Sequence, residues 1–443
     1  MRLIYERVAG LDGHKKNVVA CRMRVTAEKR LEWETKTFGT TTVELLALHD
    51  WLSEWDCTHV AMESTADYWK PVYNLLEGDF EVLLVNAQHV KKVAGRKTDA
   101  TDAEWLAELM LHGLLKASFI PAKPQRVLRE LTRYRSTLVR ERARVVNRVE
   151  KLLESTNIKL TSVVSDVMGV SARAMLEQIV AGTTEAKTLA ELAKGRLRNK
   201  LKELEAALTG VVDEHHRFIL AQQLGHIDFL DEQIETMSAE IGRQLERMSQ
   251  PPTADGSANS DQPNQLDSSA SAEQPPLSWT EAVALLDTIP GVDERVAQVM
   301  LAEMGLDMSQ FPTAKDLVSW AGLAPGNHQS GGKRYASHTT KGNNPLRSMM
   351  TQAAWAASRT KDTFLKARYH RLAARRGKKR AIVAIAHSML ESAWYMLTRR
   401  QPYQELGGDY YDQRKKESKV TYLTKQLTKL GFVVSLDPIP TAA

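Results

Sequence analysis

Four carboxylates in the N-terminal part of the sequence could bind a divalent cation. Asp12 ends a predicted strand in LDGHKK, and Glu63 ends another in AMEST. Asp99 and Asp102 lie three residues apart at the start of a predicted helix, so they share a helix face. Carboxylate oxygens suit Mg²⁺ or Mn²⁺, and two such ions can promote phosphodiester cleavage. The pattern predicts a metal centre, but Asp12-Gly13 also suits a hairpin turn and Glu63 an exposed strand end.

Ser330, in the loop segment HQSGGKR, is a second candidate for chemistry. Gly331 and Gly332 allow its backbone to approach a ligand closely, and Lys333 and Arg334 carry charges that suit a phosphate. A serine hydroxyl becomes a nucleophile when a base or a metal activates it. No acid or histidine has a diagnostic spacing to Ser330, and serine in a Gly-rich loop is commonly a turn residue. Both interpretations stay open.

Basic residues mark candidate contacts to nucleic-acid phosphates. A predicted helix carries many arginines, and it is either a solvated basic helix or one that dimerises and lies along phosphate backbones. The hairpin Ile289-Pro290-Gly291-Val292 joins two predicted helices, a pattern whose backbone N–H groups can bind phosphate but which is more often an ordinary αα-hairpin. The predicted nucleic-acid contacts are Lys97, Arg126, Arg129, Arg133, Arg140, Arg144, Gly291, Lys333, Arg334, Lys341 and Arg347.

Alternating strands and helices must position the four acids. Residues 3–40 are predicted as three strands, rich in Val, Thr and aromatic residues and broken by turns. Helices are then predicted at 43–55 and 67–78, buried strands at 58–64 and 81–87, and a helix with Thr98 as its N-cap at 97–115. A hairpin start followed by strand–helix alternation predicts an α/β domain with a mixed sheet.

The rest of the chain is predicted to be helical. Leu131, Leu138, Val145 and Leu152 repeat every seven residues, and residues 227–241 alternate intervals of three and four, both of which are coiled-coil patterns. Residues 251–277 are rich in Pro, Ser, Gln and Asp, contain no basic residue and are predicted to be disordered. A compact helical segment is predicted at 278–400. It contains the long Gly-rich loop region 320–347, whose length is typical of functional loops.

Composition sets further bounds. Lys and Arg number 60 against 54 Asp and Glu, which favours a polyanionic partner. Cys21 and Cys57 form neither a metal-ligand spacing nor a disulfide framework, which fits a reducing cytosol. No apolar run is long enough to span a membrane, and the N-terminus lacks the apolar core of a signal peptide, so we expect a cytoplasmic protein without a membrane partner.

Taken together, the segments resemble the DEDD insertion-sequence transposases, the "IS one-ten" family of recombinases. The matching N-terminal segments are GLDGHKKNV, AMESTADYW and NAQHVKKVAGRKTDATDA; the C-terminal ones are LLDTIPGV, WAGLAPGNHQSGGK and TKGNNPLRSMMTQAAW. They occur in the family's order, over roughly 1–160 and 280–400. One departure is Ala66, where many relatives carry glycine.

The resemblance implies a fold class of α/β plus all-α. It divides the chain into a RuvC-like (RNase H-like) domain at 1–120, a coiled-coil spacer at 121–250, a disordered linker at 251–277, a helical transposase domain with a helix-hairpin-helix-like element at 278–405 and a peripheral tail at 406–443.

The family's chemistry implies roles for particular residues and partners. Asp12, Glu63, Asp99 and Asp102 would bind Mg²⁺ or Mn²⁺, and Ser330 would attack DNA to give a phosphoserine link. Donor and target DNA and a structured bridge RNA are the implied partners. Homodimers or homotetramers are also implied, with active sites that combine domains from different subunits. The expected location is the bacterial cytoplasm, at the nucleoid when the enzyme is active.

Two other functions stay open on the sequence. A RuvC-like nuclease that hydrolyses branched or hybrid DNA with water would need the four acids but not Ser330. A non-catalytic nucleic-acid-binding scaffold would need only the basic helices.

Overall fold

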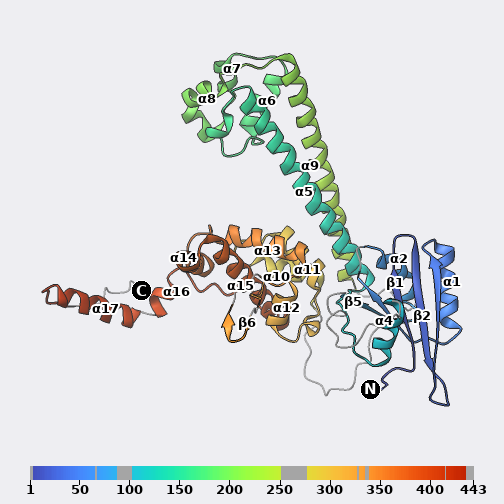
Figure 1. The fold of residues 1–443 in the computed structure, drawn as a ribbon. Coiled ribbons are helices and arrows are strands. Elements are labelled where there is room, and N and C mark those ends of the chain that lie inside the picture. Colours follow the sequence, from blue (N-terminus) through green and yellow to red (C-terminus); the bar gives the residue numbers. More distant parts are fainter. Residues whose placement is uncertain are drawn as a thin grey trace. The chain divides into compact units, whose positions relative to one another are not determined.

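The computed structural model describes residues 3–64, 67–86, 102–250, 277–326, 329–334, 339–414 and 416–435. The chain divides into two compact units, Met1–Pro121 and Ala122–Ala443 (Figure 1). The elements of the first unit are β1 (Arg7–Gly13), β2 (Asn17–Val25), β3 (Leu31–Gly39), α1 (Thr42–Ser53), β4 (His59–Glu63), α2 (Trp69–Leu76), β5 (Glu81–Val85) and α4 (Asp102–Leu111).

The first unit contains a five-stranded mixed sheet in the order β3-β2-β1-β4-β5. Strands β1, β2 and β3 form an antiparallel meander, while β4 and β5 run parallel to β1. Short turns enforce the meander: the His14 N–H donates to Asn17 O across 2.8 Å, and Thr26 N–H donates to Arg30 O across 2.9 Å. The predicted mixed sheet is confirmed, and it is compatible with the predicted RNase H-like domain.

Helices cover both faces of the sheet. Strand residues such as Leu11 and Met62 are buried with Leu48 of α1 and Leu76 of α2 on one face. On the other face, residues that include Val8, Ala61 and Val85 are buried with α4. Side chains alternate between the two faces of a strand. Since both faces of the central strands are covered by helices, successive residues of these strands are apolar. The buried strand residues thus determine the face on which the next residue of each strand lies.

Helix α4 rests directly on β1 because Gly10 has no side chain. A Cβ at Gly10 would overlap Ala103 O and Ala107 N of α4. At the other end of the helix, Leu111 O accepts from the N–H groups of Ile4 and Tyr5, which precede β1. Helix α4 therefore runs opposite to β1, and its N-terminus lies at the carboxyl end of that strand.

Gly10→Ala should destabilise the first unit. The added methyl has no space against the α4 backbone, and overpacking of this kind costs about 1–3 kcal/mol in the free energy of unfolding. Urea unfolding followed by circular dichroism measures the loss. Gly13→Ala is the matched control, since no atom lies within 4 Å of a Cβ at Gly13; it should shift stability by less than about 0.5 kcal/mol. Equal losses in the two variants would contradict the close approach of α4.

The second unit is helical among the residues that the structure describes, apart from one short hairpin. Its helices are α5 (Lys123–Ser155), α6 (Val170–Val180), α7 (Ala186–Glu191), α8 (Leu201–Leu208), α9 (Glu214–Ser249), α10 (Trp279–Asp287), α11 (Glu294–Met304), α12 (Ala314–Trp320), α13 (Asn344–Ala357), α14 (Phe364–Arg376), α15 (Lys378–Arg399), α16 (Tyr410–Arg414) and α17 (Lys416–Lys429); three short 3₁₀ segments are η1 (Leu160–Ser162), η2 (Gly195–Lys200) and η3 (Met308–Gln310).

The two longest helices, α5 and α9, lie side by side and antiparallel (Figure 1). Arg142 pairs with Asp231 at 2.5 Å, and the Gln244 side chain donates to Pro124 O at 3.2 Å nearer the other end. Within the predicted heptad pattern, Leu138 and Val145 are buried, whereas Leu131 and Leu152 are half-buried. Two residues of that pattern are therefore buried within the chain itself. Helices α6, α7 and α8 pack around one end of the pair.

Capping side chains define the starts of the C-terminal helices. An N-cap side chain accepts a backbone N–H bond at each of α10, α11, α12, α13 and α14; the caps are Ser278, Asp293, Thr313, Asn343 and Thr363. Beyond α15, the tail contacts the rest of the unit, because Tyr411 of α16 stacks on Phe364 of α14. No helix among the described residues is long and apolar enough to cross a lipid bilayer.

Candidate active site

Asp12 and Glu63 end neighbouring parallel strands at the same level. The register pairs Leu11 of β1 with Met62 of β4, so Asp12 and Glu63 are the next residues on each strand. Leu11 and Met62 are buried on the α1 and α2 face. The alternation of side chains therefore turns Asp12 and Glu63 toward the α4 face.

Asp102 comes to the same edge of the sheet from a different element. It is the first residue of α4, next to Ala103, whose backbone oxygen lies against Gly10 in β1. The antiparallel course of α4 thus brings its N-terminus to the end of β1 that carries Asp12. Three of the four predicted acids share one face and one edge of the sheet. Asp99, together with Lys97 and Thr98, lies outside the described residues.

Asp12 lies within the β-ladder. It pairs with Val19 of β2, and the tight turn falls later, between His14 and Asn17. Asp12 is therefore positioned by its pairing with β2, one residue beyond the β1–β4 ladder, and it is not itself a turn residue. Its side chain is 21% exposed, and its Oδ2 lies 3.2 Å from His14 Nε2. The carboxylate is held in place but remains reachable from solvent.

The acids offer the right kind of ligand atoms for a hard cation but do not form a tight ligand set. Among the described residues, the one group of three metal-ligand side chains whose atoms all lie within 4.8 Å of one another is Asp213, His215 and His216, at the start of α9. Asp12, Glu63 and Asp102 are not such a group. Their carboxylate oxygens fit Mg²⁺ or Mn²⁺ chemically, and their shared edge is the geometric feature on which a metal site would depend.

Ser330 lies in a short β-hairpin whose two strands have two residues each. It pairs with Lys333 across strands β6 (Gln329–Ser330) and β7 (Lys333–Arg334). Gly331 and Gly332 form the turn with φ of +56° and +78°, values that a type I′ hairpin turn requires and that glycine adopts most readily. A Cβ at either glycine would meet no atom within 4 Å, so backbone conformation explains the two glycines, and Lys333 is exposed.

The base of this loop is fixed by backbone contacts. Pro325 and Thr339 form an isolated β-bridge. Gly342 lies so close to Gly322 that a Cβ on it would overlap the Gly322 backbone. The Asn343 N–H then donates to Trp320 O at 3.1 Å. These contacts close the base of the segment that connects α12 to α13 and contains the hairpin.

Buried Glu303 joins this base to the long helix α5. Its side chain is 0% exposed, and Arg133 binds it through two hydrogen bonds of 2.6 and 2.8 Å. Arg129 lies 3.2 Å from the same carboxylate, and Asn343, which caps α13, donates to it at 2.7 Å. Burial lowers the pKa of Arg129 to about 10, and the nearby Glu303 opposes that shift. Glu303 and Asn343 were not among the functional residues predicted from the sequence; a single acid within the apolar run VMLAEMG was the available signal.

Glu303→Gln should strongly destabilise the helical unit. The substitution removes the negative charge that two arginines share, and breaking a buried ion pair costs about 3–5 kcal/mol. Urea unfolding followed by circular dichroism is the measurement. Asp231→Asn is the control, because its pair with Arg142 is partly exposed and should contribute less than about 1 kcal/mol. A Glu303→Gln protein as stable as this control would show that the network contributes little.

The other predicted phosphate contacts have different environments. Arg140, Arg144 and Lys341 are exposed, and Arg126 and Arg347 are half-buried. The structure describes Arg334 as part of β7. By contrast, the guanidinium groups of Arg129 and Arg133 are engaged by Glu303.

Gly291 has a packing explanation. Its φ is +85°, and a Cβ there would lie 2.5 Å from Ala357 N and 2.6 Å from Ala353 O of α13. The glycine therefore allows the α10–α11 hairpin to pack on α13. This contact matches the ordinary αα-hairpin alternative of the sequence analysis.

The two cysteines are not suited to nucleophilic chemistry. Cys21 and Cys57 are both buried and unbonded to each other. Burial raises the pKa of each thiol to about 11. Since the thiolate is the reactive form, both residues are protonated and unreactive near neutral pH.

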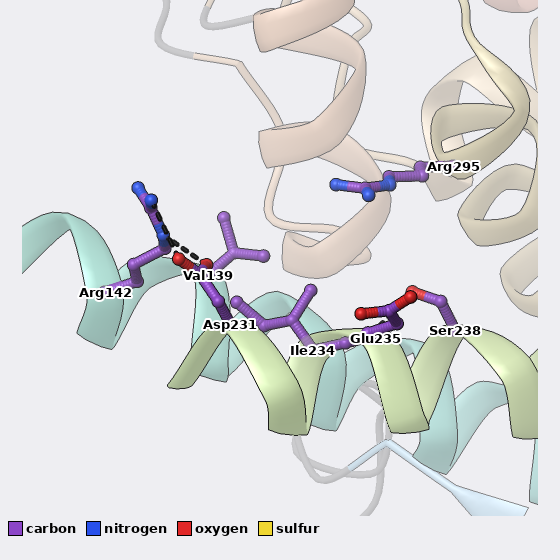
Figure 2. Close-up of a pocket in the computed structure, with 7 residues that line it drawn as sticks. All are labelled: Val139, Arg142, Asp231, Ile234, Glu235, Ser238 and Arg295. Atoms are coloured by element: carbon purple, nitrogen blue, oxygen red, sulfur yellow. Dashed lines mark hydrogen bonds and ion pairs between the residues drawn. The ribbon is translucent and has the colours of Figure 1, made fainter. Parts of the chain in front are cut away.

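A groove of about 460 Å³ lies between the α5–α9 pair and α11 (Figure 2). Arg142 and Arg295 line it together with Asp231 and Glu235, and Arg142 is paired with Asp231. The two positive charges are matched by two negative ones. The groove therefore lacks the excess positive charge that a phosphate backbone needs.

Two family models match the chain in the regions that carry these features. A model described as "Transposase" matches residues 9–158, and one described as "Transposase IS116/IS110/IS902 family" matches residues 283–370. The first match contains the three described acids and Asp99; the second contains Ser330, Glu303 and Asn343. The matches indicate an enzyme that acts on DNA.

Individual relatives agree with this class. The chain is 26% identical over 351 residues to a "Probable family 20 transposase" of Pseudomonas aeruginosa, covering 78% of this chain and 85% of the relative. It is 25% identical over 331 residues to the "Transposase for insertion sequence element IS1111A" of Coxiella burnetii, covering 72% of each. A "Pilin gene-inverting protein" of Moraxella bovis is 32% identical over 123 residues, covering 27% of this chain and 38% of the relative. The chain belongs to the IS110 family of transposases.

Proposed function

We propose that this transposase cleaves and rejoins DNA through a covalent phosphoserine intermediate, with Ser330 as nucleophile and Asp12, Glu63, Asp99 and Asp102 as ligands of Mg²⁺ or Mn²⁺. The observation that carries the proposal is the shared sheet edge of Asp12, Glu63 and Asp102. An RNase H-like assignment of the first unit is supported by its strand order, in which a three-stranded meander is extended by two strands parallel to the first.

The four acids suit a divalent cation by their chemistry, and the three described acids share one edge of the sheet. All are carboxylates, which are the ligands that Mg²⁺ and Mn²⁺ prefer. Asp12, Glu63 and Asp102 come from two adjacent strands and the start of α4, so the β-ladder and the α4 contact at Gly10 hold these three acids at one edge of the sheet. A bound cation would polarise the scissile phosphate and favour loss of the serine proton.

The proposed reaction conserves phosphodiester bonds. Ser330 Oγ loses its proton and attacks phosphorus, the bond from phosphorus to one DNA oxygen breaks, and that oxygen takes up a proton to leave a free hydroxyl end. A hydroxyl end of another strand then attacks the phosphoserine, which joins the DNA and restores the serine. Because the phosphoserine bond retains the free energy of the cleaved phosphodiester bond, strand exchange needs no ATP. Gly331 and Gly332 form the turn that directly follows Ser330, within a segment whose base is fixed by backbone contacts.

The remaining partners of the proposal are a structured bridge RNA and further copies of the chain. Both follow from the family resemblance, as do the division into RuvC-like, spacer, linker, transposase and tail segments and the assembly as homodimers or homotetramers. Of the phosphate contacts predicted from the sequence, Arg140 and Arg144 of α5 and Lys333 and Lys341 of the serine-loop segment are exposed and available to a phosphate.

Trapping of a protein–DNA adduct tests the mechanism. The full-length protein is mixed with DNA that carries the element's ends and with RNA transcribed from the flanking noncoding sequence, with Mg²⁺ or with a chelator. We expect an adduct that survives denaturation, maps to Ser330 and requires the metal. Cleavage without an adduct would favour hydrolysis by water. Binding without cleavage, whether or not metal is present, would favour a non-catalytic scaffold.

A further inference from the structure

A strongly basic surface lies where α14 meets α15. Between Asp362 and Glu391 the sequence contains eight Lys and Arg residues and no acid. Five of them fall within residues 375–380; they are Arg375, Arg376, Lys378, Lys379 and Arg380. Gly377, with φ of +80°, joins the two helices at this point, and every residue from 374 to 380 is exposed. We call these five cations the Gly377 cluster.

The Gly377 cluster is not neutralised by the described part of the chain. None of its five side chains has an ion pair, hydrogen bond or ring contact there. Other cations in this unit are engaged: Arg133 pairs with Glu303, Arg142 with Asp231, and Arg371 lies over the ring of Tyr411. The cluster therefore differs from the arginines of α5, several of which serve the packing of the unit.

The cluster also opposes the local electrostatics of α15. Lys378, Lys379 and Arg380 form the first turn of this helix, where the helix dipole already places partial positive charge. Its N-cap is Gly377, which provides no side-chain acceptor, whereas α10 to α14 each begin with one. The arrangement is unfavourable for the free helix, and a polyanion would offset the excess charge.

We propose that the Gly377 cluster binds the phosphate backbone of the DNA on which the transposase acts. This inference rests on the proposed function, to which it adds a DNA-contact surface outside the serine loop. Contacts from Lys and Arg to phosphates position a protein on DNA without carrying sequence information. The cluster should therefore contribute to affinity and to its salt dependence but not to the choice of sequence.

A charge-neutralising variant tests the proposal. In the full chain, Lys378→Gln/Lys379→Gln/Arg380→Gln should raise the Kd for a labelled duplex DNA of about 30 base pairs by about tenfold or more. The slope of log K against log salt should become shallower by about 2–3, because each phosphate contact contributes about 0.9. The control is Arg196→Gln/Arg198→Gln/Lys202→Gln, which removes the same charge from exposed positions of the second unit and should leave the slope nearly unchanged.

Folding is monitored separately, since the first variant removes cations from a helix start. Its unfolding midpoint should equal or exceed that of the unsubstituted protein, so that weaker DNA binding cannot be ascribed to unfolding. An equal loss of affinity in both triple variants would overturn the proposal, because net charge alone would then explain it. Weaker binding to a hairpin RNA with unchanged binding to DNA would also overturn it.

The proposal and the serine mechanism fail separately. If the unsubstituted protein binds duplex DNA and the Gly377-cluster variant binds it more weakly, the inference stands even where no phosphoserine adduct forms. If the unsubstituted protein forms the adduct and the variant keeps the affinity and salt slope, the inference is wrong while the mechanism stands. Absence of any DNA binding by the unsubstituted protein would overturn both.

Discussion

Asp12→Asn and Glu63→Gln should each lower the rate of DNA strand cleavage by ~1000-fold or more, equivalent to about 4 kcal/mol of transition-state stabilisation. Each substitution keeps the size of the side chain but replaces a charged oxygen ligand with a neutral amide. The two residues lie at the same level on adjacent strands, so loss of either should have a similar effect. Cleavage of a labelled DNA substrate in Mg²⁺ measures the rate.

Asp56→Asn is the matched control for these variants. Asp56 is an exposed carboxylate that precedes β4 and pairs with Arg7, so it lies toward the amino end of the strands, away from Asp12 and Glu63. Its φ of +50° suits asparagine as well as aspartate. The control should cleave at the unsubstituted rate. Normal cleavage by Asp12→Asn would remove the metal site from the mechanism.

Ser330→Ala should abolish both the covalent adduct and recombination, lowering strand exchange by on the order of 10⁴-fold or more. The substitution removes the only atom that the mechanism assigns to attack on phosphorus, while Gly331 and Gly332 still form the turn. DNA affinity should change by less than about twofold, because one neutral hydroxyl contributes little to affinity beside the charged contacts to phosphates. Denaturing gels detect the adduct, and a two-plasmid assay measures recombination.

Ser348→Ala provides the comparison for Ser330→Ala. Ser348 is an exposed serine of α13, beyond the base of the same loop. It should form the adduct and recombine DNA normally. Unimpaired recombination by Ser330→Ala would leave hydrolysis by water, or another nucleophile, as the explanation of cleavage.

The sheet and its helices could be predicted from local patterns. Strand pairs joined by short turns, and apolar runs such as THVAMES, determine the mixed sheet with few alternatives. The convergence of Asp12, Glu63 and Asp102 could be expected because residues at the ends of parallel strands meet at one edge. The distances between Asp102 and the two strand acids could not be predicted, because the position of α4 depends on how closely its backbone approaches Gly10.

Long-range packing explains what the sequence did not reveal. The heptad pattern of α5 indicated a partner helix but did not identify α9 of the same chain as one. The arginines of α5 predicted a single basic helix face. Arg129 and Arg133 instead form ion pairs with Glu303, which lies about 170 positions further along the chain. The sequence around Gly291 matched a phosphate-binding hairpin. Its packing against α13 could not be predicted, because that contact exists only in the folded structure.

The Glu303 network also bears on how the polypeptide can be divided. Its hydrogen bonds join α5, α11 and the start of α13, and Gln125 adds a further bond to Ala302 O at 3.2 Å. These contacts connect stretches of chain that lie on opposite sides of residues 251–276. A protease cut within that segment, or production of the two pieces as separate polypeptides, should therefore yield fragments that stay associated and co-purify.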